Sequence, residues 1–261
     1  MQNNNQEEFE NTAPKAINGY KTPQGKTLYL EARESESFSR LQRLVSILEI
    51  ATPTIFDVGA NIGQSIEKFR QVWPDSTIHS FEPNPSIFQQ LADRWNQIKG
   101  VTLQQLALTD KKERLPFYAT RVSEASSLLC PTERMRRIST EHKYDFDIIE
   151  IQSDTLDHYC QDRNVLNIDI LKIDVQGAEL SVLKGSQLLL EREAIKLIYL
   201  ETTFADCYDG QTQFSDLLSY LHHHGKYLLW DITPFLYTRH DRVWATNSIF
   251  LSPSAAARIE R

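Results

Sequence analysis

The chain has 261 residues and a formal net charge of −7, which suits one α/β domain with an extra segment and argues against a nucleic-acid partner. No apolar stretch is long enough to cross a membrane, and the polar N-terminus does not read as a signal peptide. The three cysteines are far apart and form neither a metal-binding spacing nor a disulfide framework, so we expect a cytoplasmic protein.

The first 50 residues precede the main alternation of strands and helices. Residues 1–16 are predicted to form a loose arm, and residues 15–30 carry Gly and Pro between apolar residues, which predicts a short hairpin. Apolar residues from Phe38 to Leu48 recur at helical spacing, so we expect an amphipathic helix beside the sheet. Such a segment could cover a ligand or form a homo-oligomer contact, and the sequence leaves both open.

The stretch from Thr54 to Gly63 is predicted to be a buried strand followed by a tight glycine loop, with a helix after it. This unit opens a nucleotide-binding sheet, because glycines allow close approach and the helix N-terminus offers unpaired N–H groups. Asp57 before the loop would repel a pyrophosphate but suits a cationic ligand such as S-adenosylmethionine (SAM). The alternative is an ordinary glycine-rich turn of any α/β protein.

The second strand, residues 77–81, is followed by Glu82, which lies 19 residues beyond Gly63. A carboxylate at this position in such a unit accepts hydrogen bonds from both ribose hydroxyls. Pro83 then helps to stop the strand and start a helix over residues 87–98. The alternative for Glu82 is a solvated acid at the end of a strand.

Residues 101–108 are predicted to be the third strand. Leu106 and Ala107 near its end would offer an apolar slot for an adenine ring, with plain strand packing as the alternative. Residues 111–153 then interrupt the alternation with two expected hairpin strands and a polar loop that contains Ser127. A connection this long is usually functional or mobile, so we consider it a possible substrate cap.

After the inserted segment, Asp154 is expected to be the N-cap of a helix. Two further strands, residues 168–174 and 195–201, end in Asp174 and Glu201, and a helix is expected between them over residues 180–190. The carboxyl ends of parallel strands meet at the ligand-binding edge of an open α/β sheet. Together with Asp57 and Glu82, these acids predict a site lined with carboxylates. The remaining chain predicts a helix, a sixth and a seventh strand, and between those strands a mixed aromatic and polar loop that includes His240 and Trp244.

In this combination the chain resembles the FkbM family of SAM-dependent methyltransferases. The motifs that carry the resemblance are Phe56-Asp-Val-Gly-Ala-Asn-Ile-Gly63, Ser80-Phe-Glu-Pro-Asn-Pro85, Leu106-Ala-Leu-Thr-Asp110, Thr155-Leu-Asp157 and Leu171-Lys-Ile-Asp-Val-Gln-Gly-Ala-Glu179. One departure is Gln176, where many members have Glu. This departure weakens any mechanism that needs a second carboxylate on that turn.

The resemblance implies an α/β, Rossmann-like class I methyltransferase fold. Its sheet would have seven strands in the order 3-2-1-4-5-7-6, the last one antiparallel, with helices on both faces. Residues 51–261 would form this domain, preceded by the N-terminal segment and interrupted by the inserted hairpin. The cofactor would be SAM, and the residues expected to bind it are Asp57, Gly59, Ala60, Asn61, Gly63, Glu82, Pro83, Leu106, Ala107 and Asp174.

The expected reaction is O-methylation of a sugar, glycan or natural-product acceptor. Asp174 would position the acceptor or act as general base, with help from Glu201. The residues expected to contact the acceptor are Ser127, Gln176, His240 and Trp244.

Several alternatives to this assignment stay open. Asp174 could contact only the methionine part of the cofactor, or could hold a divalent metal with Glu201. We do not expect a metal. The chain could also be an NAD(P)-dependent oxidoreductase, or a SAM-fold protein that binds a partner without catalysis.

Overall fold

The computed structural model describes residues 36–138, 142–233, 235–237 and 243–261. The expected N-terminal arm and hairpin lie outside the described residues, and so does His240. Within the described part, none of the helices combines the length and hydropathy needed to span a membrane.

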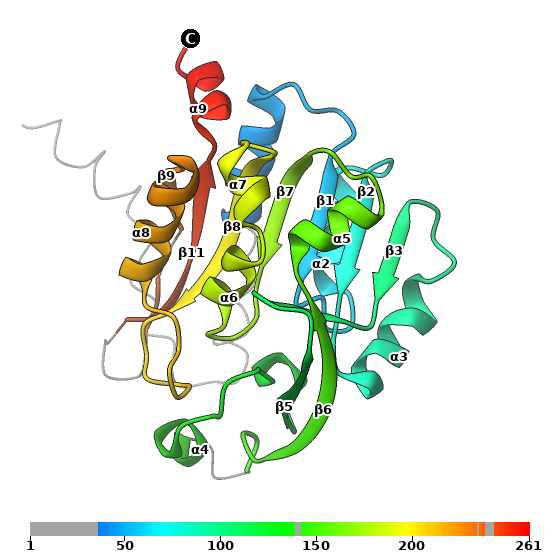
Figure 1. The fold of residues 1–261 in the computed structure, drawn as a ribbon, viewed down its shortest axis with the longest axis vertical. Coiled ribbons are helices and arrows are strands. Elements are labelled where there is room, and N and C mark those ends of the chain that lie inside the picture. The colour runs from blue at the N-terminus through cyan, green and yellow to red at the C-terminus, as the bar shows by residue number, and fades with distance from the viewer. Residues whose placement is uncertain (1–35, 139–141, 234, 238–242) are drawn as a thin grey trace, which may run out of the picture.

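The main sheet contains the predicted class I arrangement (Figure 1). Its strands are β1 (Thr54–Val58), β2 (Thr77–Phe81), β3 (Val101–Gln104), β7 (Ile168–Ile173), β8 (Ile195–Thr203), β9 (Leu228–Ile232), β10 (Leu236–Tyr237) and β11 (Val243–Leu251). They lie in the order β3-β2-β1-β7-β8-β11, and β11 also pairs with β9 and β10. Among the described strands of this sheet β11 alone runs in the opposite direction, because it is antiparallel to β8, β9 and β10. The predicted order 3-2-1-4-5-7-6 is therefore confirmed.

Helices cover both faces of this sheet, as predicted. One face packs against α5 (Leu156–Asp162), α6 (Glu179–Lys184), α7 (Gln187–Glu191) and α8 (Phe214–Gly225), which stand in front of the strands in Figure 1. The other face packs against α2 (Gln64–Val72), α3 (Pro85–Trp95), α9 (Pro253–Ile259) and the expected amphipathic helix, which is described over residues 36–47. Since both faces are covered, the central strands are almost continuously buried.

The third strand is shorter than expected. It ends at Gln104, and the chain leaves the sheet so that β4 (Ala107–Leu108) pairs with β6 (Phe146–Asp154) of a second sheet. In that sheet β6 also pairs with β5 (Arg114–Thr120), which confirms the predicted inserted hairpin. The hairpin projects beyond the carboxyl ends of the main strands in Figure 1.

Two helix boundaries also differ from the expectation. The single helix expected over residues 180–190 is broken into α6 and α7 near Gly185, where an added Cβ would lie 1.9 Å from the backbone oxygen of Thr109. The N-cap of α5 is Thr155, whose hydroxyl accepts from the backbone N–H of His158, and not Asp154, which ends β6.

The inserted segment is tied back to the main domain. Its short helices are η1 (Ser123–Ala125) and α4 (Glu133–Ile138). Ala125 and Met135 pack with Ala205, Cys207 and Tyr208 from the loop after β8. The segment therefore stands against the carboxyl edge of the sheet, where the expected site lies.

Candidate active site

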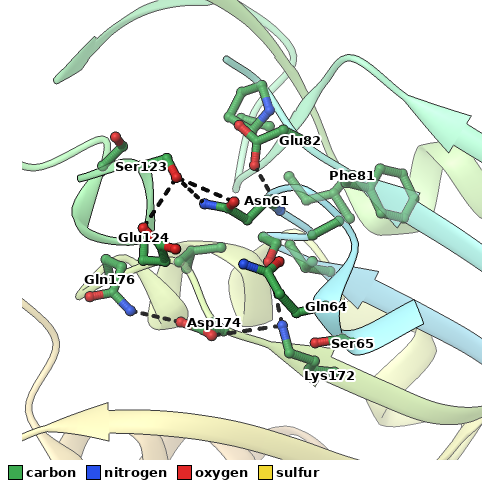
Figure 2. A pocket seen from close by; sticks show the side chains of 18 of the residues that line it. Asn61, Gln64, Ser65, Phe81, Glu82, Ser123, Glu124, Lys172, Asp174 and Gln176 are labelled. Atoms are coloured by element: carbon green, nitrogen blue, oxygen red, sulfur yellow. Dashed lines mark hydrogen bonds and ion pairs between the residues drawn. The ribbon is translucent and has the colours of Figure 1, made fainter. Parts of the chain in front are cut away.

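A cavity of about 580 Å³ opens at the carboxyl edge of the central strands, between the main sheet and the inserted segment (Figure 2). Its walls come from the loop after β1, the tip of β2, the turn that leads into β4, the hairpin and the tips of β7 and β8. The expected site residues on its wall are Gly59, Ala60, Asn61, Glu82, Pro83, Leu106, Ala107, Asp174, Gln176 and Glu201.

The loop after β1 is held in the tight form that its glycines allow. Gly59 has φ +81°, and an added Cβ would lie 1.9 Å from the backbone oxygen of Asp174, so this position needs a residue without a side chain. Asn61 also has positive φ, and its Nδ2 donates to Ser123 Oγ at 3.0 Å. The loop is thereby fixed both to β7 and to the inserted segment.

Glu82 combines burial with an orientation toward the cavity. One carboxylate oxygen accepts from the backbone N–H of Asn84 at 2.8 Å, and the other from that of Asn61 at 3.1 Å. Burial raises the pKa of Glu82 to about 7, although these two N–H groups oppose the shift. Since each oxygen has a second lone pair, the carboxylate can still accept from a ligand hydroxyl.

The apolar wall is built from two separate parts of the chain. Leu106, Ala107 and Leu108 contribute one side, and Phe117 and Leu128 of the inserted segment contribute to the same cavity. Ala107 and Phe117 pack together in a small cluster with Ile151. Leu106 and Ala107 thus line the cavity, but this part of its wall forms through the second sheet and not at the end of β3.

Asp57 does not reach the cavity. It is fully buried, and its Oδ1 lies 2.9 Å from Nζ of Lys172, the residue beside it on β7. Although burial alone would lower the pKa of Lys172, Asp57 and Asp174 hold it above its usual range. This placement does not fit direct contact between Asp57 and a cationic ligand. Asp57 acts on the cavity through Lys172, which does line it.

Asp174 and Glu201 are brought together at the tips of β7 and β8. Gln176 Nε2 donates to Asp174 Oδ1 at 2.8 Å and to Glu201 Oε2 at 2.9 Å. A second cavity, of about 100 Å³, shares both carboxylates and Lys172 with the main one. The two acids therefore lie where the two cavities meet.

Three other expected site residues lie off the cavity wall. Ser127 is buried, and its hydroxyl donates to the backbone oxygen of Gln176 at 2.8 Å and accepts from Leu129, so it fits a structural link better than acceptor contact. Trp244 packs in the cluster that joins the inserted segment to the loop after β8. Gly63 lies against Trp95 of α3 and caps α2.

Sequence reasoning missed several residues that line the cavity, among them Lys172, Phe117 and Leu128. Lys172 had a usable signal, because a lysine inside an apolar strand needs a buried acidic partner. Phe117 and Leu128 gave no such signal, since only tertiary packing brings the inserted segment to the cavity.

No group of three or more His, Cys, Asp or Glu side chains suited to a metal ion occurs in the described ranges of the chain. The alternative metal site would rest on the pair formed by Asp174 and Glu201 alone.

The strand order, the glycine loop after β1 and the acid after β2 together define a Rossmann-like methyltransferase. The chain belongs to the FkbM methyltransferase family, since the family's methyltransferase FkbM domain matches residues 57–228. This membership leaves the oxidoreductase alternative without support.

Two curated methyltransferases and one solved structure are similar to this chain. The 2-O-methyltransferase NoeI of Sinorhizobium fredii is 27% identical over 69% of this chain and 75% of its own length. Methyltransferase 1 of Beauveria bassiana is 32% identical over 50% of this chain and 57% of its own. The crystal structure of methyltransferase FkbM from Methylobacillus flagellatus is 16% identical, with a TM-score of 0.48 over 77% of this chain and 44% of that one.

Proposed function

We propose that this protein transfers a methyl group from SAM to a hydroxyl group of a sugar, glycan or natural-product acceptor. The observation that carries the proposal is the position of Glu82, which faces a cavity bounded by the glycine loop on one side and an apolar slot on the other. The relative whose name states a position of methylation, a 2-O-methyltransferase, supports oxygen as the acceptor atom.

The residues present fit this cofactor. Glu82 can accept from the ribose hydroxyls, and the slot formed by Leu106, Ala107 and Phe117 suits an adenine ring. Gly59 allows the loop after β1 to pack directly against the backbone of Asp174, so that both segments line the same cavity. The buried pair of Asp57 and Lys172 supports the loop from behind.

When bound, SAM supplies a methyl group on a sulfonium, which passes to the acceptor oxygen while the sulfur keeps the electron pair of the broken bond. The protein's task is to align the acceptor and to remove its hydroxyl proton. Asp174 lies at the junction of the two cavities and takes this proton on its carboxylate. Glu201 helps to orient the same hydroxyl from the next strand.

The test is incubation of the full chain with SAM labelled in its methyl group and a cytosolic metabolite extract, followed by mass spectrometry. We expect a labelled product whose fragments place the methyl group on oxygen. The Asp174→Asn variant should bind S-adenosylhomocysteine (SAH) like the wild type but form at most about one hundredth of the product. Label found only on nitrogen or carbon, or full turnover by the variant, would contradict the proposal.

A further inference from the structure

One amide group joins the two carboxylates at the edge of the sheet. Both hydrogens on Nε2 of Gln176 are used, one toward Asp174 on β7 and one toward Glu201 on β8. Figure 2 shows the Gln176 side chain lying alongside Asp174 at the cavity wall. The nitrogen is therefore within hydrogen-bond distance of two acids that belong to neighbouring strands.

The orientation of this amide is fixed by its hydrogen bonds. Gln176 Oε1 lies 3.2 Å from the hydroxyl of Tyr208, which also lies 2.9 Å from the backbone oxygen of Ala125. Burial, followed by the nearby acids, raises the pKa of Tyr208, so its hydroxyl stays a donor. A flipped amide would turn its oxygen toward two carboxylates and lose both bonds from Nε2, so these two bonds determine the orientation.

The backbone at this turn holds a conformation that side chains rarely adopt. Gln176 has φ +56°, and Gly177 follows it with φ +99°. A residue other than glycine in this region is uncommon and needs support from its surroundings. Here that support comes from the side-chain bonds to Asp174, Glu201 and Tyr208, together with the hydroxyl of Ser127 on the backbone oxygen of Gln176.

Two carboxylates that share one small region repel each other unless a proton, a cation or a donor lies between them. A divalent cation bound by oxygen ligands fills this role in many sites that activate a hydroxyl. In this chain the amide nitrogen of Gln176 already stands at the bridging point. A cation in the same place would have to displace it and break its bonds to both acids.

We propose that Gln176 is a positioning residue that takes the place of a divalent cation between Asp174 and Glu201, so that the acceptor hydroxyl is deprotonated without a metal. The inference rests on the proposed function in one respect, the role of Asp174 toward the acceptor. The new part of the inference is that the amide at residue 176 determines how the carboxylate of Asp174 is held. The amide keeps both acids in place and makes the reaction independent of metal.

The direct test measures Mn²⁺ binding to the full chain by calorimetry and by electron paramagnetic resonance. The Gln176→Glu variant keeps the length of the side chain but adds a third carboxylate, so we expect it to bind Mn²⁺ at least about tenfold more tightly than the wild type. The double variant Gln176→Glu with Asp174→Asn lacks one of the metal ligands, so it should lose the gain in Mn²⁺ affinity. The matched control is Gln89→Glu, because Gln89 also donates to a carboxylate, but to one only, that of Asp93, on the exposed surface of α3.

Methyl transfer to the extract supplies the second readout. We expect the wild-type rate to be unchanged by excess EDTA. In the Gln176→Glu variant the acid limb of the pH profile should move to higher pH, because three neighbouring carboxylates retain a proton. A purely structural role would lower the rate equally at every pH.

Equal Mn²⁺ affinity of wild type and Gln176→Glu, no saturable binding by either, or loss of wild-type activity in EDTA would each overturn the inference. SAH binding, measured on the same samples, separates this outcome from failure of the proposed function. If neither protein bound SAH, the cofactor assignment would fail, whereas the Mn²⁺ result reports on Gln176 alone.

Discussion

Glu82 is the residue whose environment bears most directly on ligand binding. The residue is 6% exposed, and burial raises the pKa of its carboxyl group to about 7, so near neutral pH the ligand-free protein holds this group partly protonated. A protonated carboxyl has lost acceptor capacity on one oxygen, and both oxygens already accept from backbone N–H groups. A ligand that donates hydroxyl hydrogens to Glu82 therefore binds its ionised form.

The titration of Glu82 predicts that the affinity of the protein for SAH depends on pH. The dissociation constant for SAH should rise as the pH falls from 8 to 6, approaching about tenfold per pH unit below the pKa of Glu82. The Glu82→Gln variant should bind more weakly throughout and show little of this slope, since residue 82 no longer titrates. Calorimetric titrations at several pH values make the comparison. The same slope in both proteins would mean that Glu82 does not contact the ligand.

One buried ion pair joins two neighbouring strands behind the cavity. Asp57 of β1 and Lys172 of β7 lie side by side in the parallel ladder, and Lys172 also lies 3.8 Å from Asp174. The pair links the strand under the glycine loop to the strand that carries the proposed base. Removing one partner leaves the charge of the other buried and unpaired. This loss of stability is far larger than the stability that the intact pair contributes.

For this reason we expect Lys172→Met to lower the free energy of unfolding by about 3 to 5 kcal/mol. The double variant Asp57→Asn with Lys172→Met removes both charges and should recover a large part of that loss. Urea denaturation followed by circular dichroism gives the three values. If the double variant were less stable than Lys172→Met alone, the two residues would not form the pair described here.

At the level of secondary-structure elements, the sequence predicted those features that depend on residues close together along the chain. Short apolar strands, glycine turns and strand-end acids predicted the individual strands and placed Glu82, Asp174 and Glu201 at one edge, whereas the order of the sheet was implied by the family resemblance. The early end of β3 was not predictable, because Leu106 to Leu108 remain apolar whether they continue β3 or pair with β6. The burial of Asp57 was missed since its partner lies more than 100 residues away along the chain.

At the scale of the whole molecule, two buried glutamates tie stability to pH. Burial raises the pKa of Glu82 to about 7, and burial likewise raises that of Glu179, whose carboxylate accepts from the N–H of Gly177, to about 7. The folded protein therefore keeps these protons to higher pH than the unfolded chain does. The stability contributed by the two groups is lost as the pH rises from about 4.5, the usual value, to about 7.

The variant with Glu82→Gln and Glu179→Gln isolates this effect. The substitutions place an amide N–H against a backbone N–H, so the variant should be less stable than the wild type at pH 5. The difference between the two proteins should shrink as the pH rises to 8, because only the wild type loses stability through these groups. Thermal denaturation at pH 5, 6, 7 and 8 measures the difference, and a constant or growing gap would contradict the shifted titrations.

The fold as a whole places the main sheet and the inserted segment on opposite sides of one cavity. Phe117 and Leu128 from the insertion and Ala107 from the chain before it close the apolar side, while Glu82 and Asp174 stand on the sheet side. The proposed function places an adenosine-bearing sulfur compound in this cavity. It requires both walls to contact the same ligand.

Calorimetric titration of the full chain with SAH tests this claim most directly. We predict saturable binding at one site per chain, weakened at least about tenfold by Glu82→Ala and also by Phe117→Asp, with NADH giving no heat of binding. No heat with SAH, or an affinity that neither substitution changes, would contradict it.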